Sequence, residues 1–108
     1  MFIELVKRVI ENKKLYLTLS EEFKKNLINW KLSCPEETAA IQDNEFNEKG
    51  LLINSITITE SNKKFFDYKI EVECTKVFSC GIKIIYVLKF YDDFELDDDV
   101  FYTESSKS

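Results

Sequence analysis

The sequence contains no histidine, only two glycines and a single proline. Without histidine the chain can form neither a Ser-His-Asp triad nor a Cys-His pair, and no catalytic metal can be held by imidazoles. The two glycines, Gly50 and Gly81, are too few for a glycine-rich loop that cradles phosphate groups. No apolar run approaches the roughly 18 residues that a transmembrane helix requires. These absences argue against histidine-dependent hydrolases, glycine-loop nucleotide-binding proteins and helical membrane proteins.

Cysteine is present in an odd number, as Cys34, Cys74 and Cys80. Their spacing matches neither a zinc-binding pattern nor a Cys-x-x-Cys redox pair. The first eight residues interrupt their apolar side chains with charges, whereas a signal peptide has a continuous apolar core. We therefore expect a cytoplasmic protein with reduced thiols, no bound metal and no other cofactor. A disulfide between Cys74 and Cys80 across a turn is the alternative.

The remaining composition is that of a globular domain. The chain has 108 residues, of which 44% are hydrophobic, including nine Phe, five Tyr and one Trp. Such a chain can bury a core without metal or disulfide support. We expect one domain over residues 1–104 and a disordered tail over 105–108. The formal charge of −5 disfavours nucleic acid and anionic membranes as partners, and it favours a basic protein.

The first third of the chain has helical periodicity. Residues 2–13 are predicted to form a first helix, and a second helix is predicted to end before Pro35, because the residue before proline avoids the α region. Thr18 or Ser20 is the expected N-cap of the second helix. Residues 15–20 alternate in polarity and fit either a short strand or a connector. The apolar faces of the two helices consist of Phe2, Leu5, Val6, Val9 and Ile10, and of Leu19, Phe23, Leu27 and Trp30.

Residues 34–50 read as a long polar loop, in which residues 38–42 could add one helical turn. After Gly50 the period changes to two, which predicts strands. The strand that starts near Phe66 should direct its even-numbered side chains inward and its odd-numbered ones into water. Turns are expected at residues 61–63 and 79–81, and a last short strand at 100–102. The predicted inward side chains are Leu52, Ile56 and Ile58, then Phe66, Tyr68, Ile70, Val72, Cys74 and Phe78.

The stretch from Ile82 to Tyr91 is apolar on both faces, since Ile85 and Val87 lie opposite its other apolar residues. A strand of this kind is predicted to be central in its sheet or covered on both sides. The fold class is therefore α+β, with two N-terminal helices packed on a three- to four-stranded antiparallel β-sheet arranged as a meander.

An acidic run follows this apolar strand, because six of the eight residues from Asp92 to Asp99 are acidic and aromatic residues flank them. Carboxylates beside aromatic rings are a common composition of protein-recognition surfaces. A solvated turn is one alternative. A calcium loop is another, since Asp93, Glu95, Asp97, Val100 and Glu104 fit its spacing, but Asp98 stands where the loop needs glycine. The predicted partner-binding residues are Asp92, Asp93, Phe94, Glu95, Asp97, Asp98, Asp99, Phe101 and Tyr102.

These observations predict a function that uses neither catalytic residues nor metal ligands. We expect a non-catalytic acidic protein-binding module, such as an inhibitor or an immunity-type protein that occludes a basic, nucleic-acid-handling partner. The alternatives are a structural or assembly subunit that forms a homo-oligomer, and an enzyme that uses carboxylate chemistry. The oligomeric state stays open, with a homodimer as one option.

Overall fold

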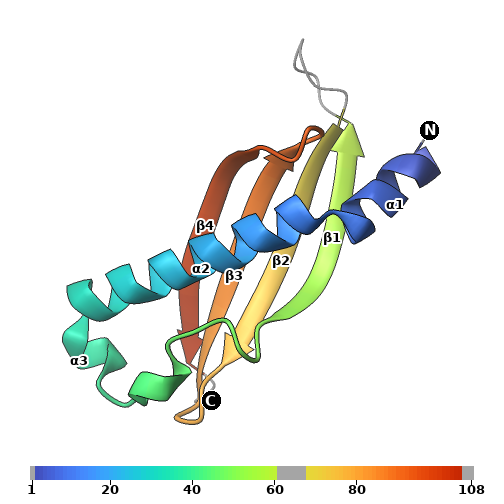
Figure 1. Cartoon of the computed structure of the whole chain (residues 1–108). Coiled ribbons are helices and arrows are strands. Elements are labelled where there is room, and N and C mark those ends of the chain that lie inside the picture. Colours follow the sequence, from blue (N-terminus) through green and yellow to red (C-terminus); the bar gives the residue numbers. More distant parts are fainter. Residues whose placement is uncertain (1, 61–67, 106–108) are drawn as a thin grey trace.

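The computed structural model describes residues 2–60 and 68–105. Helices α1, α2 and α3 span Phe2–Glu11, Lys13–Ser33 and Pro35–Thr38, and a 3₁₀ helix, η1, spans Asp43–Glu45. Strands β1 to β4 span Leu52–Glu60, Tyr68–Val77, Ile82–Tyr91 and Leu96–Ser105. The strands form one antiparallel sheet in the order β1-β2-β3-β4, and α2 crosses one face of it (Figure 1). The predicted α+β meander is confirmed, with four strands.

Helix α1 agrees with the prediction, but α2 begins earlier than the sequence suggested. The Asn12 side chain accepts a hydrogen bond from the backbone N–H of Leu15 at 2.9 Å, and it thereby caps the helix. Residues 15–20 are therefore helical and are neither a strand nor a connector, and the prediction of Thr18 or Ser20 as N-cap is wrong. Leu15 and Leu19, four residues apart, are both buried. Their spacing suits a helix as well as the alternation suits a strand.

The segment after α2 contains more regular structure than the long loop that was predicted. Pro35 occupies the first turn of α3, where its missing N–H costs no hydrogen bond. The prediction of a helical turn at residues 38–42 is wrong, because α3 ends at Thr38, and η1 adds a second short turn only from Asp43.

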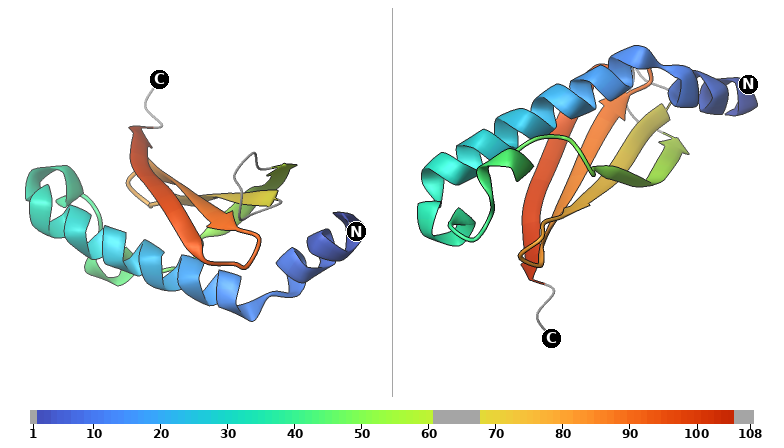
Figure 2. Two further views of the ribbon diagram at one scale, coloured as in Figure 1. Left: turned by 90° about the horizontal axis from the view of Figure 1, so that it is seen from above. Right: turned by 60° about the horizontal axis from the view of Figure 1, so that its bottom comes forward.

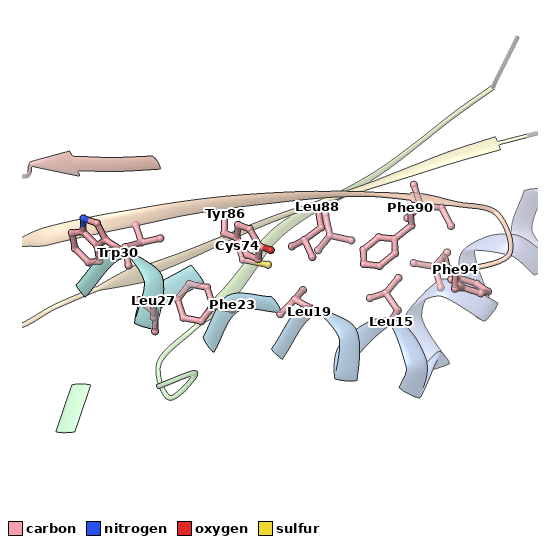
Figure 3. Packing of buried hydrophobic residues seen from close by; sticks show 14 of the residues in the cluster. Leu15, Leu19, Phe23, Leu27, Trp30, Cys74, Tyr86, Leu88, Phe90 and Phe94 are labelled. Carbon is pink, nitrogen blue, oxygen red and sulfur yellow. The ribbon is translucent and has the colours of Figure 1, made fainter. Parts of the chain in front are cut away.

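Residues 70–74 alternate between the two faces of the sheet as predicted, but Thr75, which was predicted to face water, is buried, and its hydroxyl contacts the Asn54 side chain. Ile70, Val72 and Cys74 are fully buried beneath α2, whereas Glu71 and Glu73 are half-exposed on the other face. Figure 3 shows how α2 directs one row of side chains towards the sheet. The prediction that Phe66 points inward and the prediction of a turn at residues 61–63 concern residues outside the described ranges. The row on α2 consists of Leu15, Leu19, Phe23, Leu27 and Trp30.

Among the described residues no helix lies on the other face of the sheet, which we call the open face, because α1 and α2 both lie on the opposite side (Figure 2). Strand β3 lies between β2 and β4, so the prediction that it is central is confirmed. Its residues Ile85 and Val87 face the open side. The tight turn before β3 uses Gly81 with a φ of 96°, as expected for a hairpin glycine.

Strand β1 departs from the predicted register at its beginning. A shift between Ile53 and Ser55 places Leu52 opposite Thr75, whereas Ile53 lies opposite Cys74. The prediction that Leu52 points inward with Ile56 and Ile58 is therefore wrong. A bulge of this kind adds a residue that reverses the alternation, and the sequence carries no glycine to mark it.

Strand β4 is longer than the short strand predicted at residues 100–102, since it begins at Leu96 and includes Ser105. Half of the acidic run is thus strand rather than turn. The first residue of the predicted tail, residue 105, belongs to β4. The remaining tail, residues 106–108, lies outside the described residues.

Candidate partner-binding surface

The predicted partner-binding residues lie in the β3–β4 turn and along β4. Some of them contact other parts of the fold, and the others remain accessible to a partner. In the turn, the N–H of Phe94 donates to the carbonyl of Tyr91 and the N–H of Tyr91 donates to the carbonyl of Glu95, both at 2.9 Å. The Asp93 carboxylate accepts from the N–H of Glu95 at 3.0 Å. These bonds close a tight turn in which Phe94 takes a positive φ of 67°.

Phe94 is buried inside the domain. Its ring packs near Leu15 and Phe90 in the core (Figure 3), and the Arg8 guanidinium lies 5.5 Å from the ring centroid. The guanidinium over the aromatic face is a cation–π contact that links the turn to α1. Phe94 therefore stabilises the turn, and its ring is already covered before any partner binds.

Asp97 sits at a second bulge, between the pairs formed by Lys89 and Phe90. Its carboxylate accepts from the Tyr91 hydroxyl at 2.6 Å and lies 3.3 Å from the Lys69 ammonium. The hydrogen bond to Asp97 raises the pKa of Tyr91, because the carboxylate stabilises the protonated phenol. Asp97 thus connects β4 to β2 and β3 on the open face.

Asp99 points to the opposite face, where it meets the buried hydroxyl of Tyr86. That hydroxyl donates to the Asp99 carboxylate, and the Asn26 amide lies 3.1 Å from the hydroxyl and 3.4 Å from the carboxylate. Burial, and secondly the hydrogen bond to Asp99, raise the pKa of Tyr86. Asp99 therefore belongs to a polar network that joins α2, β3 and β4.

Phe101 is half-buried under α2. Its ring centroid lies 5.8 Å from that of Tyr86, 6.0 Å from that of Trp30 and 6.4 Å from that of Phe23. Edge-on and tilted contacts at these distances stabilise aromatic clusters. Phe101, like Phe94 and Asp99, is thus used within the fold.

The open face of β4 presents the residues that remain accessible. Asp98 and Glu104 are exposed, and Val100 and Tyr102 between them are 43% and 44% exposed. Their Cα partners on β3 are Lys89 for Asp98, Val87 for Val100, Ile85 for Tyr102 and Lys83 for Glu104. Two carboxylates therefore bracket a small apolar patch at the edge of the sheet.

Further carboxylates lie at both ends of β4. Asp93 and Glu95 are exposed in the turn, where Glu95 forms an ion pair with Lys14, and Asp92 is half-exposed beside them. At the other end, Glu37 of α3 accepts from the Thr103 hydroxyl at 3.2 Å. We call the carboxylates of the turn, of β4 and of α3 beside β4 the acidic edge; it consists of Glu37, Asp92, Asp93, Asp98 and Glu104.

The calcium interpretation does not fit this geometry. The residues that match the calcium-loop spacing are distributed over the turn and the extended strand β4, so their oxygens do not converge on one point. Over residues 2–60 and 68–105, no group of three or more His, Cys, Asp or Glu side chains could hold a metal ion.

The cysteines do not form the alternative disulfide, since Cys34, Cys74 and Cys80 are all free. Cys74 is buried beneath α2, and burial raises the pKa of its thiol to about 12. A thiol protonated at neutral pH is a poor nucleophile, so Cys74 acts as a small core residue.

Lys76 is a buried residue that the sequence analysis passed over. Its ammonium donates to the backbone carbonyls of Glu45 and Asn47 at 2.5 and 2.6 Å, and burial lowers its pKa. The Glu45 carboxylate in turn accepts from the hydroxyl and the N–H of Ser79, which lowers the pKa of Glu45. Together these bonds hold the 43–49 loop against the sheet. The available signal was the position of Lys76 between Cys74 and Phe78 in the inward-facing row.

Comparisons with protein-family models, curated proteins and solved structures find no match for this chain. Among the described segments, no helix combines the length and the apolar character needed to cross a membrane.

Proposed function

We propose that the domain is a non-catalytic protein-binding module that uses its acidic edge to bind a basic partner. The observation that carries the proposal is the arrangement on β4, where exposed Asp98 and Glu104 bracket the half-exposed Val100 and Tyr102. A partner could bury the apolar patch while cationic side chains meet the carboxylates around it. Aromatic side chains inside a polar rim are typical of binding hot spots.

The charge distribution supports the same proposal. The chain has a formal charge of −5, and the acidic edge concentrates carboxylates from the β3–β4 turn, β4 and α3. Long-range attraction of this kind mainly raises the rate of association. Lys83 and Lys89 lie opposite Glu104 and Asp98, so the local field is weaker than the number of carboxylates alone suggests.

A nucleic-acid-handling protein is the class of partner that this chemistry fits best. Proteins that bind phosphate backbones do so through clustered lysine and arginine, which an acidic surface can cover. The domain would then act as an inhibitor or immunity-type protein by occluding the cationic site.

The test compares two charge reversals of equal size. One variant carries Glu37→Lys, Asp98→Lys and Glu104→Lys; the control carries Glu4→Lys, Glu11→Lys and Glu21→Lys on the exposed surfaces of α1 and α2. Each variant changes the formal charge by six, from −5 to +1. Asp93 and Asp97 are left in place because their hydrogen bonds stabilise the turn and the bulge.

Wild type and both variants are used as baits on the same lysate, and proteins retained by the wild type are identified by mass spectrometry. We expect a basic partner that the control retains and that the acidic-edge variant loses. With the purified partner, stopped-flow kinetics should show a lower association rate and a flatter salt dependence for the acidic-edge variant. Equal losses of partner binding by the two variants would show that only the net charge matters. Unchanged binding by the acidic-edge variant would overturn the proposal.

A further inference from the structure

The opposite edge of the sheet, β1, is chemically unlike the acidic edge. No charged residue occurs from Leu51 to Thr59, and Leu52 and Ile53 are 65% and 40% exposed. An edge strand presents unpaired N–H and C=O groups, and proteins usually block such strands with charges or proline. Strand β1 carries a bulge near its beginning but lacks both of these features over the seven residues from Ile53 to Thr59.

Apolar surface continues from β1 onto α1. A groove of about 340 Å³ between the two elements is lined by Val6, Val9 and Ile10 of α1 and by Ile56 and Ile58 of β1. Helix α1 extends past β1, beyond the edge of the sheet (Figures 1 and 2). Its residues Ile3 and Ile10 are 70% and 56% exposed.

We propose that β1 pairs antiparallel with β1 of a second copy of this chain, about a two-fold axis at Thr57. This inference goes beyond the proposed function, because it concerns the other edge of the sheet. The pairing joins two four-stranded sheets into one of eight strands. The projecting α1 of each copy then lies over β1 of its partner, which covers the exposed isoleucines and the groove.

The sequence of β1 is self-complementary in this register. A two-fold axis at Thr57 places Ile56 opposite Ile58 of the partner and Ser55 opposite its Thr59. The isoleucines lie on the helix side, where they pair with Val72 and Ile70 of β2, and the hydroxyl residues lie on the open face. Directly opposed side chains of an antiparallel pair share one face, so apolar meets apolar and hydroxyl meets hydroxyl.

The charge distribution favours a second copy over a basic partner at this edge. Strand β1 offers no carboxylate to attract a cation before Glu60, and the acidic edge lies on the far side of β2, β3 and β4. Two copies joined through β1 therefore keep their acidic edges apart, and the self-repulsion of two chains with a charge of −5 is reduced.

The first test measures oligomeric state by sedimentation equilibrium on the full chain, from about 1 µM to about 500 µM. We expect a dimer in this range. Thr57→Lys places two like charges at the two-fold axis and should weaken dimerisation by about tenfold or more. Val100→Lys adds the same charge to the open face of the other edge strand and should leave the dimer intact. Circular dichroism confirms that both variants are folded.

The second test locates the axis by cross-linking in a Cys34→Ser, Cys80→Ser background, which removes the two accessible thiols. Thr57→Cys should form an intermolecular disulfide on mild oxidation, since opposed Cα atoms in an antiparallel pair are about 4.5–5.5 Å apart. Val100→Cys should not. A chain that is monomeric at every concentration, or a dimer that Val100→Lys dissociates and Thr57→Lys does not, overturns the inference. Either result leaves the binding test of the acidic edge unaffected.

Discussion

Strands β1 and β4 occupy equivalent places at the two edges of one meander, yet their side chains are used in different ways. Strand β4 sends Asp99 and Phe101 into contacts with α2 and β3, and it keeps carboxylates on its outer surface. Strand β1 carries no charge before Glu60, and Leu52 and Ile53 at its beginning are left exposed. One edge is thus protected from strand pairing by charge, whereas the other is open to it over residues 53–59.

The largest expected effect is a difference between the two edge strands in how much a side chain contributes to the free energy of unfolding. Phe101→Ala removes the ring that contacts Phe23, Trp30 and Tyr86, and it should lower the free energy of unfolding by about 3 kcal/mol. Leu52→Ala at the exposed start of β1 should change it by less than about 0.5 kcal/mol. Urea titrations at a concentration where the chain is monomeric measure both values. Similar losses at the two sites would contradict the comparison.

A smaller effect is expected for the polar network of β4. Asp99→Ala leaves the buried hydroxyl of Tyr86 without its acceptor, which should cost about 1–3 kcal/mol. Asp98→Ala, one residue earlier and exposed, should stay within about 0.5 kcal/mol. The pair tests whether adjacent carboxylates of one acidic run differ in role, and equal values would show that they do not.

Alkaline pH gives a further test of the same network. The pKa of Tyr86 is raised in the folded state, above the value of about 10 of an unfolded chain. Between these two values the folded state retains a proton that the unfolded state has lost. The stabilisation is therefore complete below pH 10 and is lost as pH rises from there through the folded pKa. Tyr86→Phe should make the decline of stability above pH 10 less steep; an unchanged slope would argue against the buried proton.

The smallest effect concerns the partly exposed pair of Asp97 and Lys69. Lys69→Met keeps the aliphatic stem but removes the ammonium, and it should cost less than about 1 kcal/mol. The difference from wild type should decrease in 1 M NaCl, because salt screens pairs of this kind. A loss that is larger than that of Asp99→Ala would show that the open face, rather than the buried network, holds β4 to the sheet.

The parts of the fold that the sequence predicts correctly are those where each pattern fits one structure. The alternation from Ile70 to Cys74 fits a strand with one buried face, and the structure has it. The stretch from Ile82 to Tyr91 is apolar on both faces and fits a central strand, which β3 is. The alternation of Leu15, Leu17 and Leu19 fits two structures, and the cap at Asn12 decides for the helix. The cap bond is local, since Asn12 and Leu15 are three residues apart, so Asn12 was the signal that the sequence offered for the helix. The burial of Leu15 and Leu19, in contrast, depends on the sheet that they pack against.

The acidic run shows the same limit at the candidate site. The sequence predicts a recognition surface at these residues and leaves a solvated turn as an alternative, because carboxylates in succession favour turns by their local preferences. Asp97 and Asp99 instead accept hydrogen bonds from Tyr91 and Tyr86 on the neighbouring strand, and these partners become adjacent only when the sheet forms. The binding role of the exposed residues stays a prediction.

The packing of α2 against β3 and β4 also sets an order of events during synthesis. The apolar row of α2 ends at Trp30, but the strands β3 and β4 that it packs against end at residues 91 and 105. At about 5–20 residues per second, the ribosome needs roughly 4–15 s to add the intervening chain. A helix equilibrates in about a microsecond, so the row stays uncovered for almost all of that time. The nascent chain is therefore most prone to aggregate, and most in need of a chaperone, before its last strand emerges.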